Sequence, residues 1–365
     1  MSTREERDLL LPWIEDLPAY VPGRPANAAS GLVPVKLSSN ENPYAPLPSV
    51  LEAAIATLQD ANRYPDPQAT ELVHTLAGLC GVAPDNIAVG PGSVALLQQL
   101  AQVTSSVGDE VLFAWRSFEA YPLVTVLNGA TPVPVPLNDH EEHDLEEMAR
   151  RISDRTSLIL LCTPNNPTGA ALTTAAFHRF MRSVPASVLV VIDEAYAEFV
   201  RGSHFLDGLR EWHAYPNVAV LRTFSKAYGL AGLRLGYVIG HPELISGLRR
   251  STVPFAVPSV TQAAAIESLR RRPELIARVE AIVRERSRVL RTLADLGLSV
   301  EPSQANFVWI RWGARHQEFL DACRAAALAV RPYGDEGVRV TIGEPEENDR
   351  FLRVVSDVVA SPASA

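Results

Sequence analysis

Short runs of consecutive apolar residues alternate with segments of helix length between residue 49 and about residue 250. Such runs are typical of strands that helices cover on both faces, as in a parallel sheet. The pattern therefore predicts a doubly wound, mostly parallel α/β domain over residues 49–250. The predicted strands lie at residues 87–89, 110–113, 158–161, 188–192, 218–221 and 236–239.

The segments on either side of this domain have different patterns. Residues 1–48 contain eight prolines, which prevent a long helix, together with apolar side chains. We therefore expect an N-terminal arm that packs with the C-terminal part of the chain. Residues 251–365 begin with a long helical pattern at about 260–296, which we expect to break at Pro273. Strand candidates follow at 306–311, 328–331 and 338–342, so this part predicts a smaller α+β domain.

Composition excludes several classes of protein. The 33 Lys and Arg residues against 42 Asp and Glu residues give a net charge of −9, which disfavours nucleic acid and anionic membranes as partners. The longest apolar runs are far shorter than the roughly 20 residues of a membrane span. The charged residues near the N-terminus are unlike a secretory signal. Three widely spaced cysteines (Cys80, Cys162 and Cys323) favour reduced thiols in a cytoplasmic protein.

Four polar motifs follow predicted strands, at the sheet edge where ligands of α/β proteins bind. The first, Gly-Pro-Gly-Ser-Val-Ala at 90–95, opens a helix whose free N–H groups favour a phosphate. It also fits a loose dinucleotide fingerprint, which requires an acidic residue at the end of the next strand. Asp109 and Glu110 lie at the start of that strand and not at its end, so the spacing argues against a dinucleotide.

The other three motifs each have an ordinary structural explanation. Thr-Pro-Asn-Asn-Pro-Thr-Gly at 163–169 is a turn on any interpretation, and Asp-Glu-Ala-Tyr at 193–196 fits a helix cap. Lys226, in the glycine-rich segment 222–236, fits a solvated surface residue. However, its neighbours are hydroxyl and aromatic side chains, and Arg234 follows closely, which is unusual for a solvated lysine.

Together the four motifs match the needs of pyridoxal phosphate. A partly deprotonated lysine can form a Schiff base with an aldehyde, so Lys226 suits the aldehyde of this cofactor. Asp193 suits its ring nitrogen, and Asn166 and Tyr196 can hydrogen-bond the phenolic oxygen. An aromatic face such as Phe118 could stack on the ring. The other residues expected to bind the cofactor, mostly around its phosphate, are Gly92, Ser93, Val94, Thr223, Ser225 and Arg234.

The motifs Asn-Asn-Pro-Thr-Gly, Asp-Glu-Ala-Tyr and Ser-Lys-Ala-Tyr-Gly-Leu-Ala-Gly-Leu-Arg-Leu-Gly-Tyr resemble the fold-type I PLP-dependent aminotransferases in order and spacing. The resemblance covers essentially the whole chain, and the chain is most similar to the histidinol-phosphate aminotransferase group. It implies that Lys226 holds the cofactor and carries the proton of the 1,3-shift. It also implies a homodimer in which Tyr64 reaches the cofactor phosphate of the neighbouring subunit.

The resemblance also implies a substrate site. Arg339 matches the arginine that binds the substrate carboxylate, and an unpaired arginine between apolar strand residues would be costly. Arg331 matches the position associated with the distal phosphate of histidinol phosphate, although an exposed strand-end arginine explains it equally well. Tyr20 of the arm matches a residue that covers the substrate side. Asn306 matches a landmark position of the family.

Other segments resemble the aromatic amino-acid aminotransferase branch instead. Val94-Ala95 replaces an acidic pair, and Trp-Arg-Ser-Phe-Glu-Ala-Tyr at 115–121 replaces a proline-rich turn. An aromatic pocket of Tyr20, Phe118 and Tyr121 would suit a phenyl, indole or imidazole ring. We therefore predict ping-pong transfer of an amino group between phenylalanine, tyrosine or tryptophan and 2-oxoglutarate. Histidinol phosphate remains the alternative donor.

Three further interpretations are weighed against this one. A PLP decarboxylase of the same fold would keep Lys226 and Asp193. A regulator built on an aminotransferase-like domain would need a DNA-binding module, and residues 1–48 have no helix-turn-helix pattern. Residues 140–144, His-Glu-Glu-His-Asp, are of metal-ligand types, but their dense charge predicts a solvated loop and no metal site.

Overall fold

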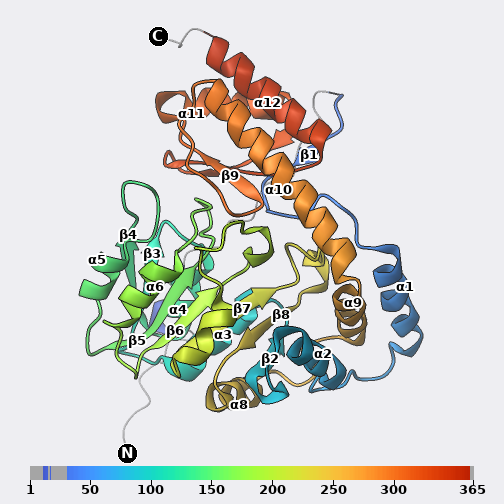
Figure 1. Ribbon diagram of the computed structural model, residues 1–365, viewed down its shortest axis with the longest axis vertical. Helices are drawn as coiled ribbons and strands as arrows, with labels where there is room; N and C mark the ends of the chain where they lie inside the picture. Colours follow the sequence, from blue (N-terminus) through green and yellow to red (C-terminus); the bar gives the residue numbers. More distant parts are fainter. Residues whose placement is uncertain (1–10, 15–16, 18–30, 362–365) are drawn as a thin grey trace, which may run out of the picture.

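The computed structural model describes residues 11–14, 17 and 31–361. Its largest sheet has seven strands in the order β2-β8-β7-β6-β5-β3-β4 (Figure 1). In that order the strands are Ile87–Gly90, Gly236–Ile239, Val218–Thr223, Leu189–Asp193, Thr156–Cys162, Glu110–Trp115 and Thr131–Pro136. The ladder from β7 to β4 is parallel throughout, so the carboxyl ends of these strands meet at one edge.

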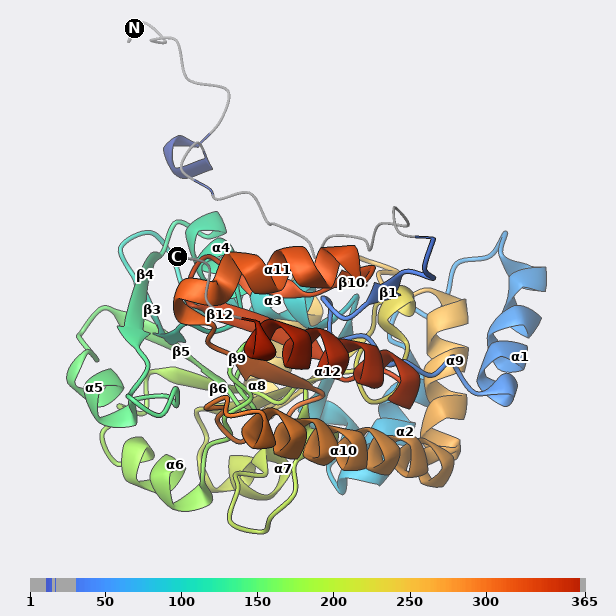
Figure 2. The same ribbon diagram turned by 90° about the horizontal axis from the view of Figure 1, so that it is seen from above.

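Helices cover both faces of this sheet, and β5 shows the alternation that results. Leu158 and Leu160 pack into a core with α3, α4 and α8, whereas Ile159 and Leu161 pack into a second core with α5 and α6 (Figure 2). All four side chains are fully buried. This arrangement confirms the predicted doubly wound sheet. These helices are α3 Ser93–Thr104, α4 Ala120–Leu127, α5 Leu145–Arg150, α6 Thr174–Met181 and α8 Pro242–Ser251.

Two strands of the sheet differ from the prediction. The sequence Thr-Pro-Val-Pro-Val-Pro forms β4, a strand that its prolines conceal in the sequence. Proline is tolerated there because β4 is an edge strand, whose only partner among the described strands is β3. The run 236–239 forms β8, which lies antiparallel to both β2 and β7. An apolar run indicates burial but not strand direction, so the sequence left this orientation undetermined.

The C-terminal part contains the small sheet β11-β12-β9, formed by Arg331–Tyr333, Gly337–Thr341 and Phe307–Ile310. Figures 1 and 2 show α10, α11 and α12 beside it. The long helical pattern is interrupted as expected: α9 ends at Arg270, and α10 begins at Arg272 with Pro273 in its first turn. The remaining helices are α1 Pro48–Thr57, α2 Thr70–Cys80, α7 Gly208–Glu211, α9 Ser259–Arg270, α10 Arg272–Asp295, α11 His316–Ala325 and α12 Pro345–Ala360.

The N-terminal segment joins the C-terminal part through strand β1, Val35–Lys36, which pairs in parallel with β10, Leu328–Ala329. One hydrophobic core runs from the α2 side of the large sheet through α9 and α10 to the small sheet. This core includes residues on both sides of the expected domain boundaries at residues 48 and 250, so it does not separate the domains there. The two boundaries stay predictions. The short 3-10 helices are η1 Pro12–Ile14, η2 Leu58–Asp60, η3 Pro84–Asn86, η4 Ala197–Phe199, η5 Trp212–Ala214, η6 Ala231–Leu233 and η7 Gly313–Arg315.

No helix within the described residues is long and apolar enough to cross a bilayer. The longest, α10, instead ties the two parts of the protein together through a buried cation. The guanidinium of Arg286 donates hydrogen bonds to the carbonyl oxygens of Phe199, at 3.1 Å, and Ala305, at 2.8 Å. Burial lowers the pKa of Arg286 to about 10, so these two carbonyls compensate a desolvated charge.

We expect Arg286→Met to lower the free energy of unfolding by about 2–4 kcal/mol, because two buried carbonyl oxygens lose their donor. Chemical denaturation measures this loss. Arg288→Met is the control in the same helix, since Arg288 is partly exposed and pairs with Glu285 and Asp349. We expect it to cost less than about 1 kcal/mol. Equal losses in the two variants would contradict the assigned role of Arg286.

Candidate active site

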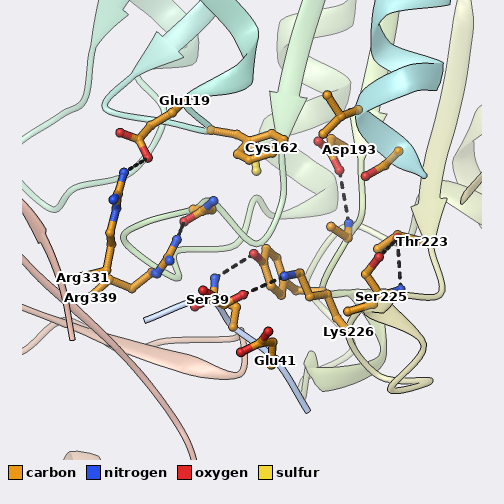
Figure 3. Close-up of a pocket in the computed structure, with 18 of the residues that line it drawn as sticks. Ser39, Glu41, Glu119, Cys162, Asp193, Thr223, Ser225, Lys226, Arg331 and Arg339 are labelled. Atoms are coloured by element: carbon orange, nitrogen blue, oxygen red, sulfur yellow. Dashed lines mark hydrogen bonds and ion pairs between the residues drawn. The ribbon is translucent and has the colours of Figure 1, made fainter. Parts of the chain in front are cut away.

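A cavity of about 240 Å³ lies at the carboxyl ends of β5, β6 and β7, closed on one side by the small sheet (Figure 3). Residues from seven separate segments of the chain meet there. The predicted site residues that line it are Ser93, Val94, Phe118, Asn166, Asp193, Tyr196, Thr223, Ser225, Lys226, Arg234, Arg331 and Arg339. The structure thus brings most of the predicted set together.

Lys226 follows β7 and projects into the cavity. Its Nζ donates a hydrogen bond to the carbonyl oxygen of Ser39 at 3.1 Å and lies 5.9 Å from the ring centroid of Tyr196. Burial, followed by the positive charge of Arg339, lowers the pKa of the Lys226 amine to about 7. A substantial fraction of this amine is therefore neutral, and nucleophilic, near neutral pH.

Asp193 is the last residue of β6 and is almost fully buried. Its Oδ2 accepts a hydrogen bond from the Tyr121 hydroxyl at 2.9 Å, and its Oδ1 accepts one from the Ala195 N–H at 3.3 Å. Burial raises the pKa of Asp193 to about 6, and these two bonds oppose the rise. The expectation that Tyr121 lines an aromatic pocket is wrong, because its side chain is fully buried and its hydroxyl is used to hold Asp193.

An anion-binding corner lies at the start of α3. Gly92 precedes the helix with φ +93°, and a Cβ at this position would collide with the guanidinium of Arg234. No side chain caps the helix, so the first N–H groups of α3 stay available. Arg234 Nη1 donates to Ser225 Oγ at 3.3 Å, and the Thr223 hydroxyl donates to the same oxygen at 3.0 Å. The corner combines helix N–H groups, hydroxyls and a cation, which suits a phosphate.

Arg339, on β12, is buried at the other end of the cavity. Its guanidinium donates to the side-chain oxygen of Asn166, to the Tyr333 hydroxyl at 2.9 Å and to the Ser38 carbonyl at 2.7 Å. Its Nε has no hydrogen-bond partner among the described residues. A buried cation that lines the cavity suits a carboxylate ligand.

Arg331 lies on β11 directly opposite Arg339 in the antiparallel register. It is buried, so the interpretation as an exposed strand-end arginine is wrong. Its Nη2 forms an ion pair with Glu119 Oε2 at 2.8 Å, and both side chains line the cavity.

Among the predicted residues that the structure describes, Gly92 and Tyr64 are not in the lining of the cavity. Tyr64 is 82% exposed, and its ring stacks on Phe255 with centroids 4.5 Å apart. Tyr20 lies outside the described residues. The 140–144 segment is only partly the solvated loop that we expected, because Glu141 and His143 are buried and His143 Nε2 lies 3.2 Å from Asn165 Oδ1. Within the described ranges no group of three or more His, Cys, Asp or Glu side chains could hold a metal ion.

Sequence reasoning missed several residues of the cavity. Asn40 donates to the Tyr196 hydroxyl at 2.9 Å, and the family landmark Asn306 donates to the Asn40 carbonyl at 3.2 Å. Asn40 is in the left-handed region at φ +53°, which asparagine tolerates well, but nothing in a proline-rich segment marks it as a site residue. The other missed lining residues include Ser38, Ser39, Glu41, Glu119 and Tyr333.

The sheet order and the residues at its carboxyl edge define a fold-type I transferase. Residues 33–355 match the family model for aminotransferase class I and II, and the chain belongs to this family. This confirms the predicted fold class and the prediction of an aminotransferase.

Similar proteins cover almost the whole chain. The aromatic amino acid aminotransferase of Streptomyces coelicolor is 53% identical over 341 residues, covering 93% of this chain and 95% of that protein. That of Thermobifida fusca is 50% identical over 341 residues, covering 93% and 94%. The histidinol-phosphate aminotransferase of Sinorhizobium meliloti, solved in complex with pyridoxal-5′-phosphate, has a TM-score of 0.87 at 28% identity, covering 97% of this chain and 98% of that one.

We expect labelling of Lys226 by an amine reagent such as fluorodinitrobenzene, in cofactor-free protein, to rise with pH around a midpoint near 7. Below this pH the amine is protonated and unreactive. Arg339→Gln removes a neighbouring cation, so the midpoint should move to higher pH. Mass spectrometry of the labelled peptide measures both profiles. A wild-type midpoint near the ordinary lysine value of 10.5 would contradict the effect of burial.

Proposed function

We propose that the protein transfers an amino group between an aromatic amino acid and 2-oxoglutarate, with pyridoxal phosphate as its cofactor. The observation that carries the proposal is a single cavity shared by Lys226, Asp193 and Arg339. These side chains supply an amine with a pKa near 7, a buried carboxylate and a carboxylate-binding cation. Relatives that are 50–53% identical bear the name aromatic amino acid aminotransferase.

The residues fit this cofactor. When bound, pyridoxal phosphate supplies an aldehyde that condenses with amines and a ring that accepts an electron pair. The corner of Gly92, Ser225, Arg234 and the first turn of α3 would hold its phosphate, and the absent Cβ at Gly92 leaves room for the Arg234 guanidinium. Asp193 would hold a proton on the ring nitrogen.

The chain's own residues would then manage the proton transfers. Lys226 Nζ accepts the proton from the substrate Cα and returns it, since its pKa near 7 allows both protonation states near neutral pH. Asp193 stays ionised above pH 6, and the Tyr121 hydroxyl supports that ionisation. Arg339, which lines the cavity, binds the substrate carboxylate and so orients the Cα–H bond toward Lys226.

Phe118 lines the cavity and supports an aromatic side chain as ligand. Histidinol phosphate is the second candidate donor, because the buried cation of Arg331 lines the same cavity. The ion pair of Arg331 with Glu119 favours the uncharged aromatic ring over that phosphate.

We also propose a homodimer and a cytoplasmic location. Tyr64, Val253 and Phe255 expose apolar surface, with Val253 at 70% and Phe255 at 39%, and exposed apolar clusters are typical of subunit contacts. The three free cysteines, Cys80, Cys162 and Cys323, support the cytoplasm.

The first test is a half-reaction on purified protein loaded with pyridoxal phosphate. We expect phenylalanine, without any acceptor, to change the absorbance of the cofactor rapidly, and histidinol phosphate to do so weakly. Lys226→Ala should abolish the transfer. Full activity of that variant would refute the assignment of Lys226, and release of carbon dioxide in place of amino transfer would indicate a decarboxylase.

The dimer can be tested by mixing two variants, Lys226→Ala and Tyr64→Ala, and allowing their subunits to reassort. If Tyr64 serves the neighbouring site, each hybrid dimer contains one site with both native residues, so about a quarter of all sites regain activity. If Tyr64 serves its own site, no hybrid site is native and activity stays at the level of the separate variants.

A further inference from the structure

The distal end of the cavity holds two buried arginines on neighbouring strands. Arg331 and Arg339 are directly opposite each other in the register of β11 and β12. In Figure 3 the two side chains start next to each other and then diverge, and Arg331 extends toward Glu119. Like charges facing each other across a strand pair repel, so an anion near them is expected on physical grounds. Glu119 supplies one, 2.8 Å from Arg331.

Glu119 is placed to act on a ligand as well as on Arg331. It follows Phe118 in the loop between β3 and α4, and both residues line the cavity. Although Glu119 is the N-cap residue of α4, its side chain makes no capping hydrogen bond and points to Arg331 instead. One loop therefore brings an aromatic ring and a negative charge to the same end of the cavity.

We propose that Glu119 is a specificity-determining residue that makes the distal end of the cavity select against substrates in proportion to the negative charge of their side chains. The proposal deepens the proposed function and rests on it. Without Glu119, the desolvated cation of Arg331 would attract a phosphate or a carboxylate. With Glu119 in place, an anionic side chain must compete with a carboxylate for Arg331 and lie beside it.

The consequence depends on ligand charge. An uncharged phenyl ring leaves the Arg331–Glu119 pair intact. The single side-chain carboxylate of glutamate or 2-oxoglutarate meets a repulsion from Glu119 of one charge against one charge. A phosphate group with close to two negative charges meets a larger repulsion. The same cavity can thus accept an aromatic donor and a monoanionic acceptor while it discriminates against a phosphorylated donor.

The test compares three donors in the half-reaction of the cofactor-loaded protein: phenylalanine, glutamate and histidinol phosphate. Glu119→Gln keeps the size of the side chain and removes its charge. In Glu119→Gln, we expect the second-order rate constant for histidinol phosphate, divided by that for phenylalanine, to rise by roughly tenfold or more. The same ratio for glutamate should rise by less. Glu119→Asp, which keeps the charge, should preserve the wild-type preference, and the cofactor absorbance shows that each variant is folded and loaded.

Two further variants separate this role from general loosening of the structure. Glu336 pairs with Arg116 between the same loop and the same small sheet, but it does not line the cavity with Lys226. Glu336→Gln should therefore leave the donor ratios unchanged. The second variant is the double mutant Arg331→Gln/Glu119→Gln, compared with Arg331→Gln alone. Here the Glu119→Gln change should raise the rate constant for histidinol phosphate much less than it does in the wild-type protein, because the cation that the phosphate would bind is gone.

The outcomes are distinct. The role of Glu119 is overturned if Glu119→Gln changes the rate constants of all three donors equally or changes none of them. It is also overturned if Glu336→Gln produces the same change in donor ratios. In each of these cases, transfer from phenylalanine still supports the proposed function. If the wild-type protein reacts with none of the donors, the proposed function fails, and this inference fails with it.

Discussion

Arg339 connects parts of the chain that are far apart, and the shape of the active-site cavity depends on these connections. From β12 its guanidinium reaches Asn166 after β5, Ser38 in the N-terminal segment and Tyr333 on β11. A buried cation is costly unless such partners surround it, so the burial of Arg339 depends on the packing of these three segments. The same charge also contributes to the lowered pKa of Lys226.

Burial then brings two groups with very different ordinary pKa values close to neutrality. The pKa of Asp193 rises to about 6 and that of Lys226 falls to about 7, in both cases chiefly because water is excluded. Both residues follow or end strands of a sheet that helices cover on each face. The sheet edge therefore supplies the low-polarity surroundings, and local hydrogen bonds such as that of Tyr121 limit the shift.

The two ends of the cavity have different origins. The end with Asp193, Lys226 and Arg234 is built on the large sheet, whereas the end with Arg331 and Arg339 comes from the small sheet. Under the proposed function, substrate preference can therefore change through the small sheet and the loop after β3 without moving Asp193 and Lys226. This division accounts for one fold being shared by proteins named for aromatic amino acids and for histidinol phosphate.

The sequence by itself determined the class of fold, the interruption of the long helix at Pro273 and the polar motifs of the large sheet, because apolar periodicity and turn residues act locally. It did not determine β4, whose prolines obscure the pattern, or the direction of β8. Only the tertiary structure decided that Tyr121 holds Asp193 and that Glu119 pairs with Arg331. Each of these contacts joins segments distant in the chain, and the packing that brings such segments together leaves no local pattern in the sequence.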